Sequence, residues 1–167
     1  DDLLAFPNGL ELLLHAPDKV TRGWKQAVET LLPALRPWMH LLMAPRYDGQ
    51  DAARFARAER LALSLDLTTV ASARPLMHHG ARRRLTDILT CIREGLKIED
   101  LGRAAQANAE QRLRGEGEMR RIFAGFERAV DRSTEIAKRL QFDIQSLRYE
   151  YPSEISDGET AQDRLAR

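Results

Sequence analysis

Two short apolar runs bounded by prolines constrain the fold of this chain more than any other feature. Residues 10–16 are mostly apolar and end before Pro17, and residues 38–43 lie between Pro37 and Pro45. Apolar runs of this length, interrupted by a residue that cannot continue regular structure, are typical of short buried strands. We therefore expect a strand at each of the two runs.

The segment between these runs has the pattern of an amphipathic helix. Apolar residues recur at helical spacing from residue 20 to residue 32. Asp18 is the expected N-cap, and Pro33 and Pro37 are the expected end of the helix. The two runs and this segment together predict a strand–helix–strand unit.

The same order then repeats. Residues 51–65 alternate apolar and charged side chains at helical spacing, and residues 67–71 form a β-branched run. Strands that alternate with helices favour parallel βαβ units in an α/β fold.

The second half of the chain has the periodicity of helices. Residues 85–92 carry an apolar stripe that ends at Gly95, and residues 118–140 form a longer amphipathic stretch. Gly115 and Gly117 predict a flexible joint before that stretch. The expected fold class is α/β with a mainly helical second half.

Charge and cysteine content narrow the class of protein. The chain has 26 Lys and Arg against 25 Asp and Glu, which excludes a polybasic tail and an acidic disordered chain. It has no apolar run near the roughly 20 residues that a membrane span needs, so we expect a cytoplasmic location and no membrane partner. Cys91, the single cysteine, lies among apolar residues and is expected in the core.

The sequence contains few residues with self-contained chemistry. His15 and His40 end or interrupt strand-like runs and are expected to be packed and hydrogen-bonded, with a ligand role as the alternative. His78 and His79 lie in a turn that leads into a helix. Three adjacent cations follow, and they are either a contact for phosphate groups or a solvated basic turn: Arg82, Arg83 and Arg84.

Five short segments of the second half resemble one family. They are residues 85–95, 108–114, 118–119, 134–137 and 147–152, the last of which reads LRYEYP. In order and spacing they resemble the α subunit of bacterial DNA polymerase III, a C-family polymerase, in its error-prone branch. Residues 1–66 match that family only in their pattern of strands and helices.

The resemblance implies a division of the chain. Residues 1–79 would be the later part of a polymerase-and-histidinol-phosphatase (PHP) domain, which is a distorted α/β barrel, and residues 80–152 a helical connection toward the polymerase palm. Residues 153–167 would be an acidic exposed tail. The catalytic carboxylates that hold magnesium ions would lie beyond Arg167, so we expect no catalytic residue and no cofactor in this segment.

The resemblance also implies a role for the parent protein. That protein would add deoxynucleotides to a primer on a DNA template during error-prone repair of damaged DNA and replication. Its partners would be DNA, deoxynucleotides, the rest of the polymerase chain, the sliding clamp and mutagenesis accessory proteins. This segment would be a non-catalytic scaffold.

One departure from the family bears on metal binding. Metal-binding members carry an Asp-x-His motif after the last strand of the PHP domain, and here Arg74 stands at the Asp position and Leu76 at the His position. Neither side chain can coordinate a metal ion. Two alternatives stay open: an independent PHP-type metal-dependent phosphoesterase and a non-enzymatic helical interaction module.

Tyr149 and Tyr151 would lie on one side of an extended strand, with Arg148 and Glu150 on the other. We expect the two rings to pack within the intact protein. Stacking of the rings on nucleobases is the alternative.

Overall fold

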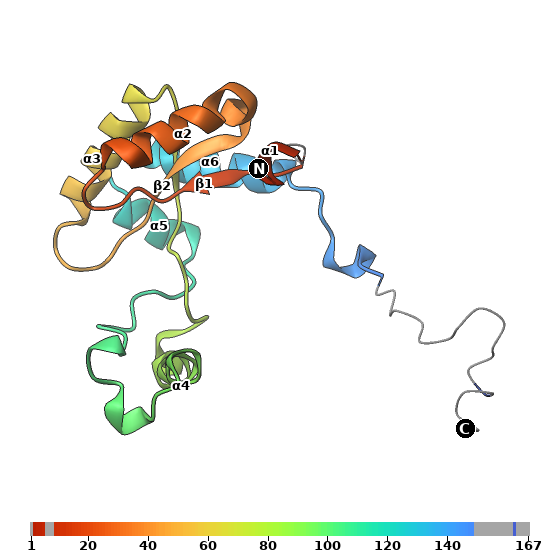
Figure 1. The fold of residues 1–167 in the computed structure, drawn as a ribbon. Coiled ribbons are helices and arrows are strands. Elements are labelled where there is room, and N and C mark those ends of the chain that lie inside the picture. Colours follow the sequence, from red (N-terminus) through yellow and green to blue (C-terminus); the bar gives the residue numbers. More distant parts are fainter. Residues whose placement is uncertain (1, 6–8, 149–161, 163–167) are drawn as a thin grey trace.

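A computed structural model describes residues 2–5, 9–148 and 162 of the chain. Its centre is a sheet of three parallel strands in the order β1–β2–β3 (Figure 1). The strands are β1 (Leu12–Leu14), β2 (Met39–Met43) and β3 (Thr68–Ala71). The structure therefore confirms all three expected strands and their parallel arrangement. The expectation that the first strand is buried was wrong, because β1 lies at an edge of the sheet and Leu13 is 45% exposed.

The crossover helices α2 (Arg22–Leu35) and α3 (Asp51–Ser64) connect these strands. Both lie on one side of the sheet (Figure 1), as two crossovers of the same hand require. The register pairs Leu12 with Met39, and His40 with Thr68. The result is a mixed α/β structure, and its relation to a PHP barrel stays a prediction.

One expectation for the first helix was wrong, whereas its end, at Leu35, lies between Pro33 and Pro37 as expected. Asp18 does not cap α2; the side chain of Thr21 accepts a hydrogen bond from the Trp24 amide at 3.2 Å. The Asp18 carboxylate is instead held by Arg46, a partner that is distant in sequence. Pro33 lies inside α2 because the helix continues to Leu35, which is buried in the core, and the missing amide affects only the last turn.

The core under α2 and α3 is aliphatic. Met39 and Leu41 of β2 point to this side and are 1% and 0% exposed. They pack against residues of α2 and the end of α3: Val28, Leu32, Leu35, Ala62, Leu65 and Leu67.

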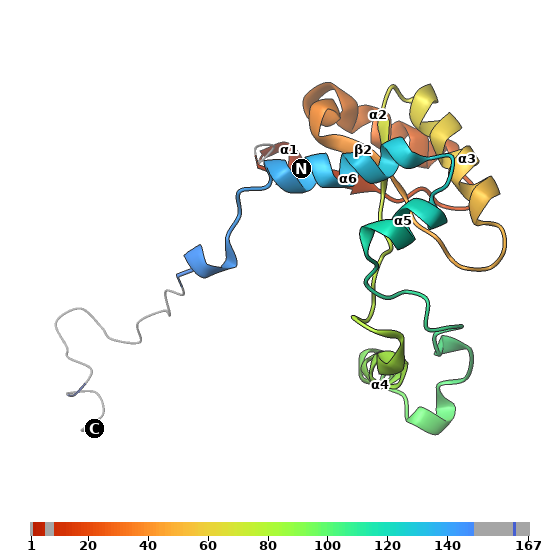
Figure 2. The ribbon, with the colours of Figure 1, turned by 180° about the vertical axis from the view of Figure 1, so that it is seen from behind.

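Two further helices, α5 (Glu116–Ile122) and α6 (Glu127–Arg139), return to the sheet. Figure 2 shows α6 across the face opposite α2 and α3. Phe123, between the two helices, is fully buried and stacks on Phe55 of α3 at 4.6 Å between ring centroids. The core of the sheet therefore includes residues on both sides of the expected boundary at residue 79, and the domain division itself stays a prediction.

The expected single amphipathic stretch over residues 118–140 is broken. The chain turns at Gly125, whose φ of 86° favours glycine, so α5 ends before α6 begins. The joint that was expected at Gly115 and Gly117 lies elsewhere: Gly115 is the N-cap of α5, and Gly117 is inside it.

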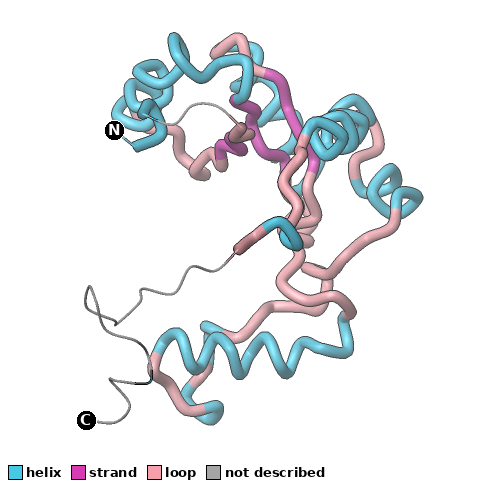
Figure 3. The backbone as a smooth tube through the Cα atoms, turned by 90° about the vertical axis from the view of Figure 1, so that its right-hand side faces the viewer, coloured by secondary structure: helices cyan, strands magenta, loops and turns pink. Residues whose placement is uncertain are grey.

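The helix α4 (Arg83–Glu94) lies apart from the sheet in both ribbon views (Figure 1 and Figure 2) and in the backbone tube (Figure 3). It ends at Gly95 as expected, with φ of 66°. We call residues 78–110 the α4 lobe. It is connected to the rest by two adjacent segments, in which the Leu76 amide donates to the Gln111 carbonyl at 2.8 Å and the Leu113 amide donates to the Met77 carbonyl at 3.1 Å.

The chain after Arg82 is helical in α4, α5 and α6, as expected, whereas residues 95–115 form turns and short 3₁₀ segments. Cys91 is buried as expected, against the turns of the lobe. The remaining short elements are α1 (Asp2–Ala5), η1 (Arg36–Trp38), η2 (Gly80–Arg82), η3 (Ile98–Asp100), η4 (Gly102–Ala104) and η5 (Ile144–Ser146). Within the described part of the chain, no helix is long and apolar enough to cross a membrane.

Candidate functional site

The segments that follow the three parallel strands lie at one edge of the sheet and carry polar side chains. His15 and Asp18 follow β1, Arg46 follows β2 and Arg74 follows β3. In open α/β sheets, ligands bind at this carboxyl edge. The edge is therefore the first place to look for a functional site.

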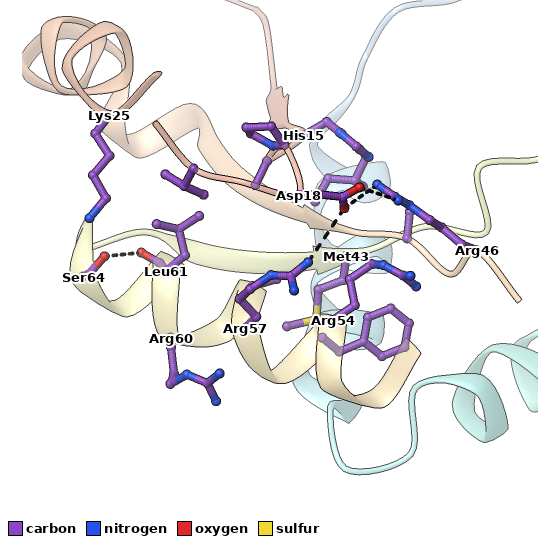
Figure 4. Close-up of a pocket in the computed structure, with 17 residues that line it drawn as sticks. His15, Asp18, Lys25, Met43, Arg46, Arg54, Arg57, Arg60, Leu61 and Ser64 are labelled. Atoms are coloured by element: carbon purple, nitrogen blue, oxygen red, sulfur yellow. Dashed lines mark hydrogen bonds and ion pairs between the residues drawn. The ribbon is translucent and has the colours of Figure 1, made fainter. Parts of the chain in front are cut away.

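A cavity of about 400 Å³ lies there, between α2, α3 and the end of β2 (Figure 4). Its volume is within the range of small-molecule sites. Among the described residues that line it, five side chains are cationic and one is a carboxylate: Lys25, Arg46, Arg54, Arg57 and Arg60, and Asp18. We call it the cationic cavity.

Two arginines converge on the single carboxylate of the lining (Figure 4). Each nitrogen of the Arg46 fork lies 2.8 Å from an oxygen of Asp18, and a nitrogen of Arg57 lies 3.8 Å from Asp18 Oδ1. The hydrogen bond from Arg46 lowers the pKa of Asp18 and raises that of Arg46. The lining thus holds one bidentate anion position with a third cationic contact.

Arg54 is compensated by other groups. It donates to Asp48 at 2.6 Å and pairs with Asp51. Asp51 also accepts hydrogen bonds from the backbone amides of Arg46 and Tyr47 at 2.8 and 2.9 Å, which fixes the loop after β2 on the first turn of α3. This arrangement orients the backbone of Arg46.

Arg74 and His15 meet at the rim of the cavity. Arg74 Nη1 lies 3.1 Å from His15 Nε2, so the guanidinium donates to a neutral imidazole. Burial, then Arg74 and Arg46, lower the pKa of His15. His15 is exposed, unlike the packed histidine that was expected, but the hydrogen bond to its ring is present.

Arg74 and Leu76 are the two positions that the sequence analysis assigned to the family's metal motif. Arg74 is exposed with a φ of 44°, and Leu76 is 49% exposed. A guanidinium has no free electron pair for a metal ion. Across residues 2–5, 9–148 and 162, no three side chains of His, Cys, Asp and Glu gather in a way that suits a metal ion.

A second polar cluster lies on the opposite face of the sheet, under α6. His40 is 4% exposed; its Nδ1 lies 2.7 Å from Thr68 Oγ1, and its Nε2 lies 3.0 Å from Glu11 Oε2. Arg139, at the end of α6, lies 2.7 Å from Glu11 Oε1. His40 is therefore packed and hydrogen-bonded, as expected, and the cluster connects the sheet to α6.

The other predicted site residues lie elsewhere. Arg82 and Arg84 are exposed in the α4 lobe, Arg83 is 3.7 Å from Asp87, and the three are not part of the cationic cavity. His79 is in the expected turn, where its Nδ1 accepts from the Ala81 amide. Tyr149 and Tyr151 lie outside the described residues.

The cationic cavity was not predicted from the sequence. One signal for it was present: Arg54, Arg57 and Arg60 recur every three residues on α3. The partners from the other segments, Asp18 and Arg46, are 28 residues apart and meet only because β1 and β2 are neighbours.

Almost the whole chain is similar to known proteins. No family model matches it. It is 40% identical over 166 residues to the error-prone DNA polymerase of Ruegeria pomeroyi, 38% over 168 residues to that of Bradyrhizobium diazoefficiens, and 33% over 165 residues to that of Caulobacter vibrioides. These alignments cover 98–99% of this chain but only 14–15% of the relatives. Over nearly its whole length, the chain is therefore similar to one segment of error-prone DNA polymerases.

Proposed function

We propose that this chain is a non-catalytic scaffold segment of an error-prone DNA-directed DNA polymerase. The parent protein would add deoxynucleotides to a primer on a damaged DNA template, during repair and replication. Magnesium ions and the catalytic carboxylates would belong to other parts of that protein. The names of the relatives support the polymerase, and the chemistry of the sheet edge supports the scaffold role.

The observation that carries the scaffold role is the position of Arg74. It follows β3 at the carboxyl edge of the sheet, and its guanidinium donates to His15 at 3.1 Å. The resemblance puts a metal-binding carboxylate at this position in metal-dependent members. A fixed positive charge there repels a metal ion, and its hydrogen bond occupies the imidazole nitrogen that would otherwise coordinate one. This chemistry disfavours the phosphoesterase alternative.

The packing supports a role in holding other parts in place. Phe55 of α3 and Phe123 between α5 and α6 pack in one cluster with Ala129 and Val130 of α6, and Glu11 binds Arg139 at the end of α6. An element that follows α6 in the parent chain would therefore start from a fixed position on the sheet.

A chimera tests the proposal. The matching segment of the Ruegeria pomeroyi polymerase is replaced by this chain, and primer extension on a DNA template is measured with magnesium. We expect the chimera to retain primer extension, because this chain supplies the buried residues that the scaffold needs to fold. A matched chimera with Phe123→Asp, which puts a charge into the core, should lose extension. A folded chimera without extension would contradict the proposal.

The phosphoesterase alternative has a test of its own. The 167-residue chain is incubated with magnesium, manganese or zinc and a phosphomonoester, and phosphate release is measured. We expect none. Metal-dependent release that disappears in the double variant His78→Ala and His79→Ala would instead favour the enzyme.

One feature favours the interaction-module alternative as an additional role. The apolar stripe of α4 is exposed: Leu85, Ile88, Leu89 and Ile92 are 48–71% exposed. We propose that the rest of the polymerase chain covers this face. In the chimera, Ile92→Asp should lower the thermal stability of the polymerase, whereas Arg93→Asp, at the next position, should not. Equal stability of the two variants would contradict the docking role.

Contacts of Arg82, Arg84 and neighbouring Arg83 with the DNA backbone also stay a proposal. Their replacement by Gln should weaken DNA binding at every sequence and reduce its salt dependence. Binding with an unchanged salt dependence would favour a solvated basic turn.

A further inference from the structure

The scaffold role involves only the rim of the cationic cavity, where Arg74 donates to His15, and the chemistry of the rest is that of an anion site. Five cationic side chains line it, and the charges of two of them, Lys25 and Arg60, have no ion-pair partner among the described residues. Such a concentration of one charge in a concave site attracts small anions.

The anion position is at the end of the cavity where Asp18 lies. Arg46 and Arg57 point to the same carboxylate from two elements, the loop after β2 and the helix α3 (Figure 4). Asp18 is exposed to water, and its side chain is 60% exposed. An internal carboxylate in this position occupies the forks of the arginines without being locked into the core, so an external anion can replace it.

Much of the wall between the two ends of the cavity is apolar. Val20, Leu42, Ala58 and Leu61 contribute to it, and Lys25 and Ser64 lie at the end away from Asp18. A bare anion would leave this part in contact with water. The lining therefore suits a ligand with an anionic group at one end and a flat or apolar group attached to it.

We propose that the cationic cavity binds a phosphate monoester with a nucleoside-sized apolar group, with its phosphate between Arg46 and Arg57 in place of Asp18. A terminal phosphate carries nearly two negative charges at neutral pH and offers three oxygens, so it can accept from both guanidinium forks at once. The phosphate can come from a free nucleotide or from the 5′ end of a DNA strand. This inference is independent of the scaffold role.

Binding to the 167-residue chain tests it, with thymidine monophosphate, thymidine, and a short oligonucleotide with or without a 5′ phosphate as probes. Calorimetry measures each affinity. We expect a probe with a terminal phosphate to bind, and its counterpart without the phosphate to bind at least about tenfold more weakly. Binding of the monophosphate alone assigns a free nucleotide, and binding of the phosphorylated oligonucleotide alone assigns a DNA end.

Three variants locate the binding. Arg57→Gln should weaken binding of the phosphorylated probe at least about tenfold, and Arg57→Lys should weaken it less, because lysine keeps the charge but not the fork. Asp18→Asn should strengthen it severalfold, because the internal competitor is removed. The matched control is Arg121→Gln on α5, outside the cavity, which should bind as the unmodified chain does.

Several outcomes would overturn the proposal. They are equal binding of thymidine and its monophosphate, equal affinities of the Arg57→Gln and Arg121→Gln variants, and binding of no phosphorylated probe at millimolar concentration. Thermal unfolding of each variant is measured alongside. If Arg57→Gln does not fold, the Asp18→Asn variant decides, because a cluster with only a structural role would not gain affinity when Asp18 loses its charge.

Discussion

The helices α4 and α6 are similar in length and amphipathicity, but only α6 has its apolar face covered within the described part of the chain. α6 buries Ala129, Val130 and Ile136, and it lies along β3. α4 buries two threonines and Cys91 and leaves its large apolar side chains exposed. The comparison teaches that an amphipathic pattern specifies an apolar face without specifying what covers it. For α6 the cover is in this chain, and for α4 it is not among the described residues.

The largest difference between the two regions should appear in core substitutions. Phe123→Ala removes a fully buried ring that stacks on Phe55, and it should lower the free energy of unfolding by about 3–5 kcal/mol. Leu89→Ala in α4, where the side chain is 56% exposed, should cost about 1 kcal/mol or less. Urea unfolding of the two variants measures both. Equal losses would show that the face of α4 is covered, for example by a second copy of the chain.

Replacement of the turn glycines Gly125 and Gly95 should show a smaller difference in stability between the two regions. Gly125 joins α5 to α6 with a φ of 86°, and Gly95 ends α4 with a φ of 66°. Alanine at either position meets open space but a strained backbone, at a cost of about 1–2 kcal/mol.

The loss of stability should appear in a different measurement for each of the two glycine variants. For Gly125→Ala the cost should appear in global unfolding, because α6 is part of the core. For Gly95→Ala it should appear in local opening of the α4 lobe, measured by hydrogen exchange. Global destabilisation of the same size in both variants would mean that the lobe and the sheet unfold as one unit.

The sequence predicted the sheet well because the strands are encoded locally. Proline-bounded apolar runs give β1 and β2 regardless of what lies around them. The ends of the helices were predicted less well, since they depend on distant residues: Asp18 could cap a helix, but Arg46 holds it 28 positions away.

The cationic cavity could not be predicted from the sequence for the same reason. Arg46 and Arg57 come from two elements, and no local pattern shows that both face Asp18. The contact between Arg74 and His15 likewise crosses from β3 to β1. Of the candidate site residues singled out from the sequence, His15 lines this cavity and Arg74 contacts it at the rim, but neither pointed to an anion site.

The polar cluster under α6 should give the sheet a pH dependence. Burial is the main cause that lowers the pKa of His40, against the opposing effect of Glu11. The folded state therefore keeps His40 neutral at a pH where the unfolded chain takes up a proton. Stability is present above the unfolded pKa, near 6.5, and is lost as the pH falls below it.

The groups that face His40 are Glu11, Thr68, and Arg132 and Arg139 of α6. His40→Gln should flatten the change in unfolding free energy between about pH 7 and pH 5.5. The pKa of His15 is also lowered, so His15→Gln serves as the comparison variant and should flatten it less, because His15 is exposed. An unchanged slope in His40→Gln would contradict this assignment.

The smallest effect is expected where the α4 lobe meets the sheet. Glu118 of α5 accepts from Arg112 at 2.6 Å and from Arg114 at 2.9 Å, and these hydrogen bonds lower the pKa of Glu118 to about 2. Arg114 also lies over the Tyr47 ring at 5.3 Å. These contacts connect the segment that leaves the lobe to the loop after β2.

Glu118→Gln should loosen this connection without disturbing the core, because Arg114, whose side chain is 6% exposed, keeps its ion pair with Glu110. We expect an unchanged urea midpoint but faster cleavage by trypsin after Arg112, whose ion pair with Glu118 is lost, and a smaller change after Arg114, which stays paired with Glu110. Glu116→Gln, on the same helix and paired with Arg120 instead, is the matched control and should leave cleavage at both positions unchanged. A lower midpoint in Glu118→Gln alone would show that the lobe supports the sheet, and the contrast between the two regions would then be one of packing only and not of stability.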